Sequence, residues 1–526
     1  MQLLAFIFFT ALVAVISYLA NRKTNENSSD GYFLGGRSLT GIVIAGSLLL
    51  TNLSTEQIVG LNGAAFKEGI LVMAWETLAA IAMVVTAVVL LPKYLKQGIT
   101  TVPQFLENRF DKTTKSITSG LFLTGYVVVL LPTVLYTGAL ALNNMFDVPE
   151  MLGVSKNVAL WGTVWGIGII GSIYAIFGGL KAVAVSDTIN AVGLLIGGLL
   201  IPILGLAFIG DGNVLDGATI LIEKAPEKFK VIGDHKSTIP FATIFTGMML
   251  VQLFYWGTNQ AIIQRALGAK NLKEGQKGLI YAAFIKILGP LIVVLPGIIA
   301  FYLFGNTLEN ADEAYPELVK KVLPASLVGF FAAVIFGAIL SSFNSALNSS
   351  VTLFGLDIYK AHINKEASER QTVKAGKRFG ILLAILSMCI APLLVYAESI
   401  FSYLQEVNGI YSIPILTIIV VGYFTKYVPA FAAKFGILSG SILYIISQFI
   451  LQPYFGKENY PHFLHVMAIL FVANIIIMLI IGRLRPRTEA YSLLYTKQVD
   501  ITPWKYVTIT GIIICAIVVY SYVYFS

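Results

Sequence analysis

The sequence has little charge, few cysteines and few histidines. Only 12% of its 526 residues are Asp, Glu, Lys or Arg, whereas an ordinary soluble domain has about 25%. This difference excludes a plain soluble protein. The two cysteines, Cys389 and Cys515, lie far apart inside apolar runs, so neither a disulfide framework nor a thiolate metal site is predicted.

Motifs of energy-consuming and hydrolytic enzymes are missing as well. The sequence has no P-loop, no GxSxG motif and no HExxH motif, which argues against an ATP-driven pump and a membrane hydrolase. No polar linker divides the chain, so residues 1–526 are predicted to form one membrane unit. The net charge of +8 comes from short basic clusters between apolar blocks, which indicates membrane topology and not binding to nucleic acid.

Long apolar stretches dominate the sequence. The hydrophobic set makes up 57% of the residues, and stretches of about 20 apolar residues are long enough to cross a bilayer as helices. The first stretch has no preceding Lys or Arg, so we predict a helix there and not a signal peptide. The fourteen expected spans are 2–20, 40–64, 70–95, 116–146, 157–178, 183–209, 239–264, 278–305, 325–360, 377–397, 399–424, 431–453, 461–482 and 504–525.

Basic residues are unevenly divided between the two sides that these spans define. If successive connections alternate sides, one side carries 26 of the 36 Lys and Arg residues and the other carries nine, with Lys286 inside a span. Basic residues accumulate in cytoplasmic loops. The richer side is therefore expected to be cytoplasmic, and the even number of spans places both termini outside.

Four charged residues lie within apolar spans. They are Glu56, Glu76, Asp187 and Lys286. A charge near the bilayer centre costs at least about 2.5–3.5 kcal/mol, so such a residue needs a partner, water or a function. Structural ion pairs or snorkelling to the interface are the alternatives, and Asp187 is the residue nearest to a span end.

Two spans carry a polar run in their middle. Residues 51–57 read TNLSTEQ, and residues 252–260 read QLFYWGTNQ, five spans later. Thr, Asn and Ser favour local backbone hydrogen bonds over a continuous helix. Two interrupted helices at corresponding positions of two five-helix halves indicate an inverted-repeat secondary transporter with its site at midplane. The alternative is two helices that pack through polar faces.

A third polar cluster, AILSSFNS, lies at residues 338–345. Its members include Ser341, Ser342, Asn344 and Ser345. Hydroxyl and carbonyl oxygens bind a hard cation such as sodium, and few carboxylates suit an ion that must also leave. Small hydroxyl residues also line helix contacts in membranes, which is the alternative explanation of this cluster.

These clusters, in this order, resemble the sodium:solute symporter family, especially its sodium/glucose and sodium/galactose branch. The resemblance extends over nearly the whole chain. Its motifs are GYFLGGRS at 31–38, NLSTEQ at 52–57, FGGLKA at 177–182, YWGTNQ at 255–260 with IQR at 263–265, and LNS at 347–349 with DIY at 357–359.

The resemblance implies an all-α integral membrane protein of the leucine-transporter type. Its core would be a 5+5 inverted repeat over residues 40–424, in which the first and sixth core helices are broken. Residues 2–20 would add one N-terminal helix, and 431–525 would add three C-terminal helices. A bacterial inner membrane is the location that the resemblance and the basic loops imply.

The resemblance also implies site residues. Sugar-binding polar residues would be Asn52, Gln57, Glu76, Gln252, Lys286 and Gln405, with Tyr255 stacked over the sugar as an inner gate and Trp256 beside it. Sodium would bind the backbone carbonyls of Leu50, Leu53 and Ala338 and the hydroxyls of Ser341 and Ser342. Some relatives have a second sodium site, which here would comprise Asp187, Ser341, Asn344 and Ser345.

Departures from the family pattern leave the substrate open. Ala79 stands in place of a sugar-contacting serine, Gln252 replaces an asparagine, and Asn344 replaces a hydroxyl of two-sodium relatives. Span 116–146 has no Lys or Arg, whereas sialic-acid relatives use an arginine there. We therefore expect a symporter that imports a neutral monosaccharide such as galactose or glucose with one or two Na⁺.

Several alternatives remain at this stage. The same fold could couple sodium or protons to myo-inositol, a nucleoside, a carboxylate or sialic acid, and Asp187 could carry the proton. A membrane sensor or an uncoupled facilitator belongs to another class. The expected partners are the solute, sodium and the lipid bilayer; a monomer suffices for this mechanism, and the sequence leaves the oligomeric state open.

Overall fold

The computed structural model describes residues 2–21, 28–235, 237–308, 310–396, 400–456 and 458–524. Within these ranges the chain is helical, without a β-strand, and has one isolated bridge between Leu39 and Ala269. The predicted junction between spans 377–397 and 399–424 falls on residues 397–399, which lie outside the described part of the chain. The all-helical class predicted from the apolar runs is confirmed.

Most helices follow one another through short connections, residues 485–506 form a longer one, and several helices contain a π-helical turn. The α-helices are α1 Gln2–Asn21, α2 Ser29–Leu34, α3 Gly41–Asn52, α4 Thr55–Glu68, α5 Ala74–Val85, α6 Leu91–Gln97, α7 Val102–Arg109, α8 Lys112–Gly125, α9 Leu131–Phe146, α10 Val148–Leu152, α11 Lys156–Ile209, α12 Val214–Lys224, α13 Phe241–Thr243, α14 Met249–Gly257, α15 Gln260–Leu267, α16 Leu272–Lys286, α17 Gly289–Val293, α18 Leu295–Phe304, α19 Ala314–Val322, α20 Ala325–Thr352, α21 Glu369–Ile390, α22 Ile400–Phe424, α23 Ala430–Ile446, α24 Gln452–Phe455, α25 Phe463–Leu484 and α26 Val507–Tyr524.

Ten described helices are long and apolar enough to cross a membrane, or twelve if each of two bent pairs counts as one span. The number is lower than fourteen partly because the 43 residues Thr55–Gln97 count as one span, although α4 ends at Glu68 and α5 begins at Ala74 beyond a turn at Gly69. Two further apolar helices, Leu4–Ser17 and Gly41–Asn52, are shorter than a full span. The chain is thus a multi-pass membrane protein, and the count of fourteen spans stays a prediction.

Both polar runs that predicted a helix break contain one. The first helix ends at Asn52 and resumes at Thr55, with Leu53 at ψ 55° and Ser54 in an extended conformation. The second break separates α14 from α15, which are bent by 47°. There the Asn259 side chain accepts a hydrogen bond from the Ala261 N–H and so begins α15. A polar side chain thus caps the start of α15, the second half of this broken span.

A third bend, of 52°, separates α16 from the helices that follow it. It lies directly after Lys286, at Gly289-Pro290, where proline removes a backbone donor from the helix. A Cβ on Gly289 would overlap the Glu76 carboxylate. The bend and the glycine together let α17 approach α5 closely beside Lys286.

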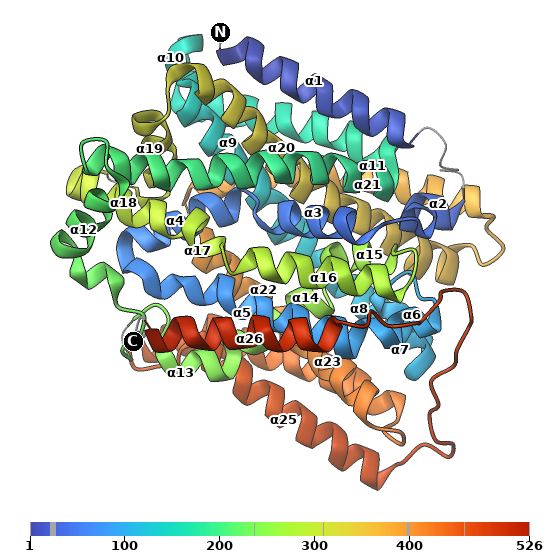
Figure 1. Ribbon diagram of the computed structural model, residues 1–526. Coiled ribbons are helices and arrows are strands. Elements are labelled where there is room, and N and C mark those ends of the chain that lie inside the picture. The colour runs from blue at the N-terminus through green and yellow to red at the C-terminus, as the bar shows by residue number, and fades with distance from the viewer. Residues whose placement is uncertain are drawn as a thin grey trace.

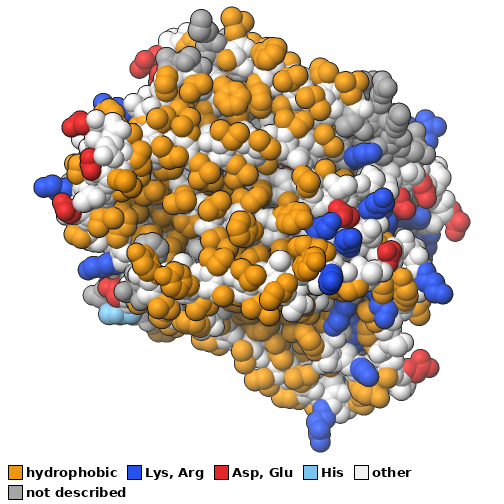
Figure 2. All heavy atoms as spheres, in the orientation of Figure 1, with side chains coloured by type: hydrophobic (Ala, Val, Ile, Leu, Met, Phe, Trp, Pro, Cys, Tyr) orange, Lys and Arg blue, Asp and Glu red, His pale blue; other side chains and the backbone are white. Residues whose placement is uncertain are grey.

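The helices pack in a bundle around α3, α11, α16 and α20 (Figure 1). In the view of Figure 1, α26 crosses the front beside α5 and α16, while α1 lies along one edge on α11 and α20. Figure 2 shows a broad hydrophobic front face, with Lys and Arg side chains gathered towards the end that holds α2, α6, α7 and α15. A hydrophobic belt with a basic end is the surface expected of a membrane protein.

Candidate functional site

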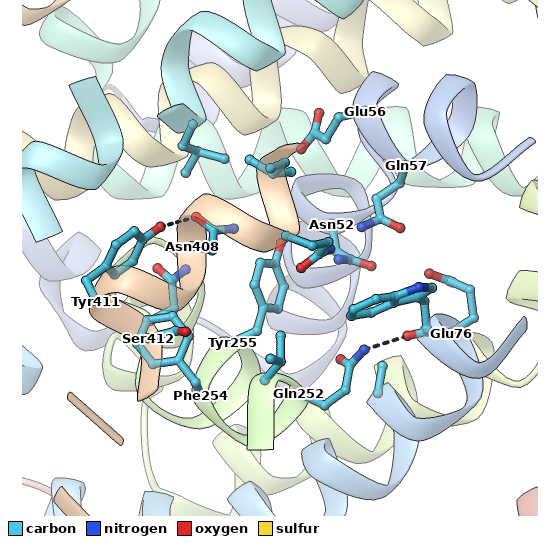
Figure 3. Close-up of a pocket in the computed structure, with 17 residues that line it drawn as sticks. Asn52, Glu56, Gln57, Glu76, Gln252, Phe254, Tyr255, Asn408, Tyr411 and Ser412 are labelled. Carbon is cyan, nitrogen blue, oxygen red and sulfur yellow. Dashed lines mark hydrogen bonds between the residues drawn. The ribbon is translucent and has the colours of Figure 1, made fainter. Parts of the chain in front are cut away.

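A polar cavity lies where the two broken helices meet α5 and α22 (Figure 3). Its volume is about 50 Å³, which accommodates a few water molecules. Seventeen residues line it. They are Asn52, Glu56, Gln57, Trp75, Glu76, Ala79, Leu130, Val251, Gln252, Phe254, Tyr255, Asn259, Leu404, Gln405, Asn408, Tyr411 and Ser412.

Six of the eight predicted substrate-binding residues line this cavity: Asn52, Gln57, Glu76, Gln252, Tyr255 and Gln405. They come from five helices, α3, α4, α5, α14 and α22. The other two, Trp256 and Lys286, are fully buried behind the wall and do not line it. Their position suits residues that hold the lining side chains in place, and not residues that contact a solute directly.

Lys286 forms a buried ion pair with Glu76. The Lys286 ammonium donates a hydrogen bond of 2.5 Å to Glu76 Oε2, and each side chain is only 1% exposed. Lys286 Nζ also lies 5.8 Å from the centre of the Trp256 ring. Mutual neutralisation reduces the cost of burying both charges, and it leaves the other Glu76 oxygen as an acceptor beside the cavity.

Gln252 is held in place by two hydrogen bonds. Its amide nitrogen donates to the Trp75 carbonyl at 2.8 Å, as Figure 3 shows, and its amide oxygen accepts from the Trp256 indole at 3.2 Å. The Trp256 ring therefore fixes which end of the Gln252 amide faces Trp75. This arrangement explains why Trp256 lies in the polar run without reaching the cavity.

The cavity wall is rich in hydrogen-bond acceptors. Asn52 Oδ1, Glu56 Oε2 and Gln57 Oε1 are buried and accept no hydrogen bond from the described part of the protein. Such buried acceptors need donors, and a polyhydroxylated solute carries many. No Lys or Arg is among the seventeen lining residues, so the wall offers no basic group to an anionic solute.

One wall of the cavity contains residues that the sequence reasoning did not single out. Asn408, Tyr411 and Ser412 belong to α22, and the Tyr411 hydroxyl donates to Asn408 Oδ1 at 2.5 Å (Figure 3). They lie within two turns of the predicted Gln405. Polar residues recurring along one face of the apolar span 399–424 were the signal that would have identified them.

Contacts between α3 and α20 involve two of the five predicted sodium ligands, Ser341 and Ser342. The Ser342 hydroxyl donates to the Thr51 carbonyl at 2.8 Å, and the Thr51 hydroxyl lies 3.3 Å from that of Ser341. Leu50 and Leu53 flank this point at the end of α3, and Ala338 lies one turn before Ser341 and Ser342 on α20. The broken end of α3, with carbonyls free of helix partners, therefore faces the hydroxyls that would complete an oxygen site.

Two of the four residues of the predicted second sodium site, Asp187 and Ser345, lie beside an arginine. Arg265 donates to the Ser345 hydroxyl and, at 3.1 Å, to the Ser47 hydroxyl, and its guanidinium lies 3.9 Å from Asp187 Oδ2. Ser47 in turn donates to Asp187 Oδ2 at 2.6 Å. A fixed positive charge thus occupies the neighbourhood of Asp187. Asn344 Oδ1 is buried and accepts no hydrogen bond among the described groups.

These features define a class. A bundle of membrane-spanning helices with a polar cavity and an oxygen-rich cluster at its helix breaks is the arrangement of an ion-coupled secondary transporter. Residues 32–442 match the family model described as the sodium:solute symporter family. The chain belongs to this family, which confirms the resemblance and sodium as the coupling ion. The members of the family are secondary transporters and not enzymes.

Similar proteins agree with this assignment. The chain is 47% identical to the "Uncharacterized symporter YidK" of Escherichia coli (strain K12), over 99% of this chain and 90% of the relative. It is 31% identical to the sodium/glucose cotransporter of Vibrio parahaemolyticus, over 90% of each chain. The solved structure of a Na⁺-coupled sialic acid symporter in a substrate-bound outward-open state superposes with a TM-score of 0.76 at 21% identity, covering 93% of this chain and 98% of that one.

Proposed function

We propose that this protein imports a neutral monosaccharide, such as galactose or glucose, together with sodium by alternating access. The observation that carries the proposal is the cavity wall, which combines unpaired amide and carboxylate acceptors with Tyr255 and has no basic lining residue. Sugar hydroxyls supply donors for those acceptors, and an aromatic ring packs on the sugar's C–H face. The name of the Vibrio relative, a sodium/glucose cotransporter, supports the same solute class.

An anionic solute fits this wall poorly. Glu56 lines the cavity without a basic partner among the described residues, and Lys286 is already paired with Glu76. A carboxylate in the cavity would therefore face acceptors and an unpaired carboxyl group, which is costly in a buried site. This argument favours a neutral sugar over sialic acid or another carboxylate.

We further propose that one sodium ion binds, at Leu50, Leu53, Ala338, Ser341 and Ser342. Arg265 provides the positive charge beside Asp187 and Ser345 that a second sodium would otherwise provide. Two cations so close together would repel one another. The sodium ion would join the end of α3 to α20 and favour the outward-open state, which requires tighter binding to that state than to the inward one.

The membrane arrangement is part of the proposal. The chain would be a single unit in a bacterial inner membrane, with the basic end towards the cytoplasm and both termini outside. Residues 40–424 would form the inverted-repeat core, flanked by 2–20 and 431–525. A tag at either terminus should then be accessible to antibody in intact spheroplasts, and a tag in the 265–277 connection should not.

Uptake of labelled galactose and glucose into proteoliposomes tests the solute and the ion together. We expect accumulation with an inward sodium gradient, and none with equal sodium, a proton gradient or potassium. Accumulation driven by protons alone would refute sodium coupling. Absence of uptake of both sugars would refute this solute assignment, and competition by unlabelled myo-inositol and nucleosides would then identify another neutral solute.

A further inference from the structure

A second hollow, separate from the cavity at the helix breaks, lies at the membrane boundary between α21 and the π-helical segment Leu353–Ile363 that continues α20. Its volume is about 480 Å³, within the range of small-molecule sites. The rings of Phe354 and Phe379 stack within it, with their centres 3.9 Å apart and their planes at 9°. Tyr359 and Ile363 line the side opposite α21. We call these residues, with Lys374, Arg378 and Leu382, the boundary groove.

Positive charge is concentrated on one face of this groove. Arg370, Lys374 and Arg378 follow one another at four-residue intervals on α21, so they lie on one face of the helix. Like charges at this spacing repel one another. Lys374 and Arg378 are exposed, line the groove and have no hydrogen bond or ion pair with the described residues. The two basic side chains of the groove therefore have no negatively charged partner among the described residues.

The opposite end of the groove is apolar and faces lipid. Leu382 lies one helical turn beyond Arg378, about 6 Å deeper along α21, and 52% of it is exposed. Ile381 and Ile385 are 47% and 43% exposed on the same apolar stretch, which forms part of a candidate membrane span. Along α21 the basic residues are thus followed by apolar residues, in the same order as the phosphate and the acyl chain of a phospholipid.

We propose that the boundary groove binds an anionic glycerophospholipid, with its phosphate on Lys374 and Arg378 and an acyl chain on Phe379 and Leu382. Guanidinium groups bind phosphate through two parallel hydrogen bonds, and basic hollows between membrane helices hold anionic headgroups. A soluble anion would use only the basic end and leave the exposed apolar end uncovered. A lipid satisfies both ends, and this assignment is independent of the transported solute.

Native mass spectrometry of the purified full-length protein in detergent tests the proposal. The probes are phosphatidylglycerol, phosphatidylcholine with the same acyl chains, and inorganic phosphate. The variant is Lys374→Gln/Arg378→Gln, whose changes are on the exposed surface. The matched control is Lys270→Gln/Lys273→Gln, which removes two exposed charges outside the groove. Thermal midpoints establish that all three proteins are folded.

We expect phosphatidylglycerol to bind the groove variant about 30-fold more weakly than the wild type, since each basic residue near a membrane surface contributes a factor of about five. The control should bind like the wild type, and phosphatidylcholine should bind all three proteins equally weakly. A conservative Arg378→Lys variant should retain most of the binding.

Three outcomes would overturn the assignment. Equal binding of phosphatidylglycerol to the wild type and the groove variant would remove Lys374 and Arg378 from any lipid site. An equal loss of phosphatidylglycerol binding in the control would show that binding depends on the net charge of the protein and not on the groove. Displacement of the lipid by millimolar inorganic phosphate would assign the groove to a soluble anion.

Discussion

At the scale of single side chains, Glu76 and Lys286 form an ion pair that is buried beside the cavity. Burying these two charges is costly unless each neutralises the other. Lys286→Met leaves the Glu76 carboxylate buried without its partner. We expect a loss of about 3–5 kcal/mol in stability and the loss of sugar uptake. The thermal midpoint in detergent and the rate of uptake in proteoliposomes measure the two effects.

The double variant Glu76→Gln/Lys286→Met separates stability from function. Replacing a whole buried pair by neutral groups is often close to neutral for stability, so its thermal midpoint should return towards that of the wild type. Transport should stay low, because the acceptor at position 76 is gone. Recovery of uptake in the double variant would show that the pair has only a structural role.

Ser342 gives a residue-scale test of the sodium site. Ser342→Ala removes a hydroxyl that lies at the broken end of α3, and a lost ligand to a charged group costs about 1.5–3 kcal/mol. The sodium concentration for half-maximal uptake should therefore rise at least about tenfold. Ser350→Ala is the matched control, since Ser350 is buried on the same helix but donates to Ala346. An unchanged sodium dependence in Ser342→Ala would refute the site.

Sequence analysis identified site residues where an unusual residue interrupted an apolar span and also fell in a motif of the resembled family, and it missed Asn408, Tyr411 and Ser412. Glu76 and Gln57 stand out for this reason, and six predicted residues line the cavity. Arg265 did not stand out, because it lies near a span end where basic residues are common; only the fold brings it within 3.9 Å of Asp187. A residue whose role depends on a distant partner has no local signal.

At the scale of helices, the bend after α16 depends on a glycine. Gly289→Ala would place a methyl group against the Glu76 carboxylate, so α17 and α5 would have to separate and the bond to Lys286 would lengthen. We expect a lower thermal midpoint and at least about a tenfold loss of uptake. Gly120→Ala is the control, because a Cβ there meets no atom within 4 Å. Equal behaviour of the two variants would contradict this account of the bend.

The two breaks in the long apolar helices could be predicted, and the bend after α16 was not. Thr, Asn and Ser compete for backbone hydrogen bonds and so mark the breaks at 51–57 and 252–260 in the sequence itself. Gly289-Pro290 is short and lies in an apolar region, where such pairs are common in membrane helices. This Gly-Pro pair matters because α17 packs on α5 there, and no local sequence pattern predicts that contact.

The outer connection between α18 and α20 carries a pH-dependent contact. Asp312 lies in the turn Ala311–Glu313, against α4 near Gly63. Burial raises the pKa of Asp312 from 3.8 to about 6, and Lys67 lowers it in part while Glu313 raises it. A raised carboxyl pKa stabilises the folded state below the unfolded value, and this contribution is lost as the pH rises through about 6.

Asp312→Asn should therefore be more stable than the wild type at pH 7.5, by about 2 °C in thermal midpoint. The gap should narrow as the pH falls towards 4.5, because the wild-type carboxyl group is then protonated in the folded protein. Asp216→Asn, on the exposed face of α12, is the control for loss of charge. A gap that does not change with pH would show that Asp312 is not the titrating group.

At the scale of the whole molecule, two of the expected spans are joined by a tight turn at a glycine. Spans 40–64 and 70–95 were expected to be separate, and α4 indeed ends at Glu68 before α5 begins at Ala74, with Gly69 at a φ of 80° between them. Glycine adopts this conformation without strain and turns the chain without a polar loop. Apolar composition therefore predicted the class of the fold, and the number of fourteen spans stays a prediction.

The cavity of about 50 Å³ is too small for a hexose, so transport requires a wider conformation of the whole bundle. If sodium favours the outward-open state, a cysteine at Ala79 should react faster with a small thiol reagent added outside in sodium than in potassium. The background would be Cys389→Ser/Cys515→Ser, and labelling would be followed by mass spectrometry. Added sugar should slow the reaction, and Ser342→Ala should abolish the difference between the two ions. Equal rates in sodium and potassium would mean that the ion binds both conformations alike and cannot drive the cycle.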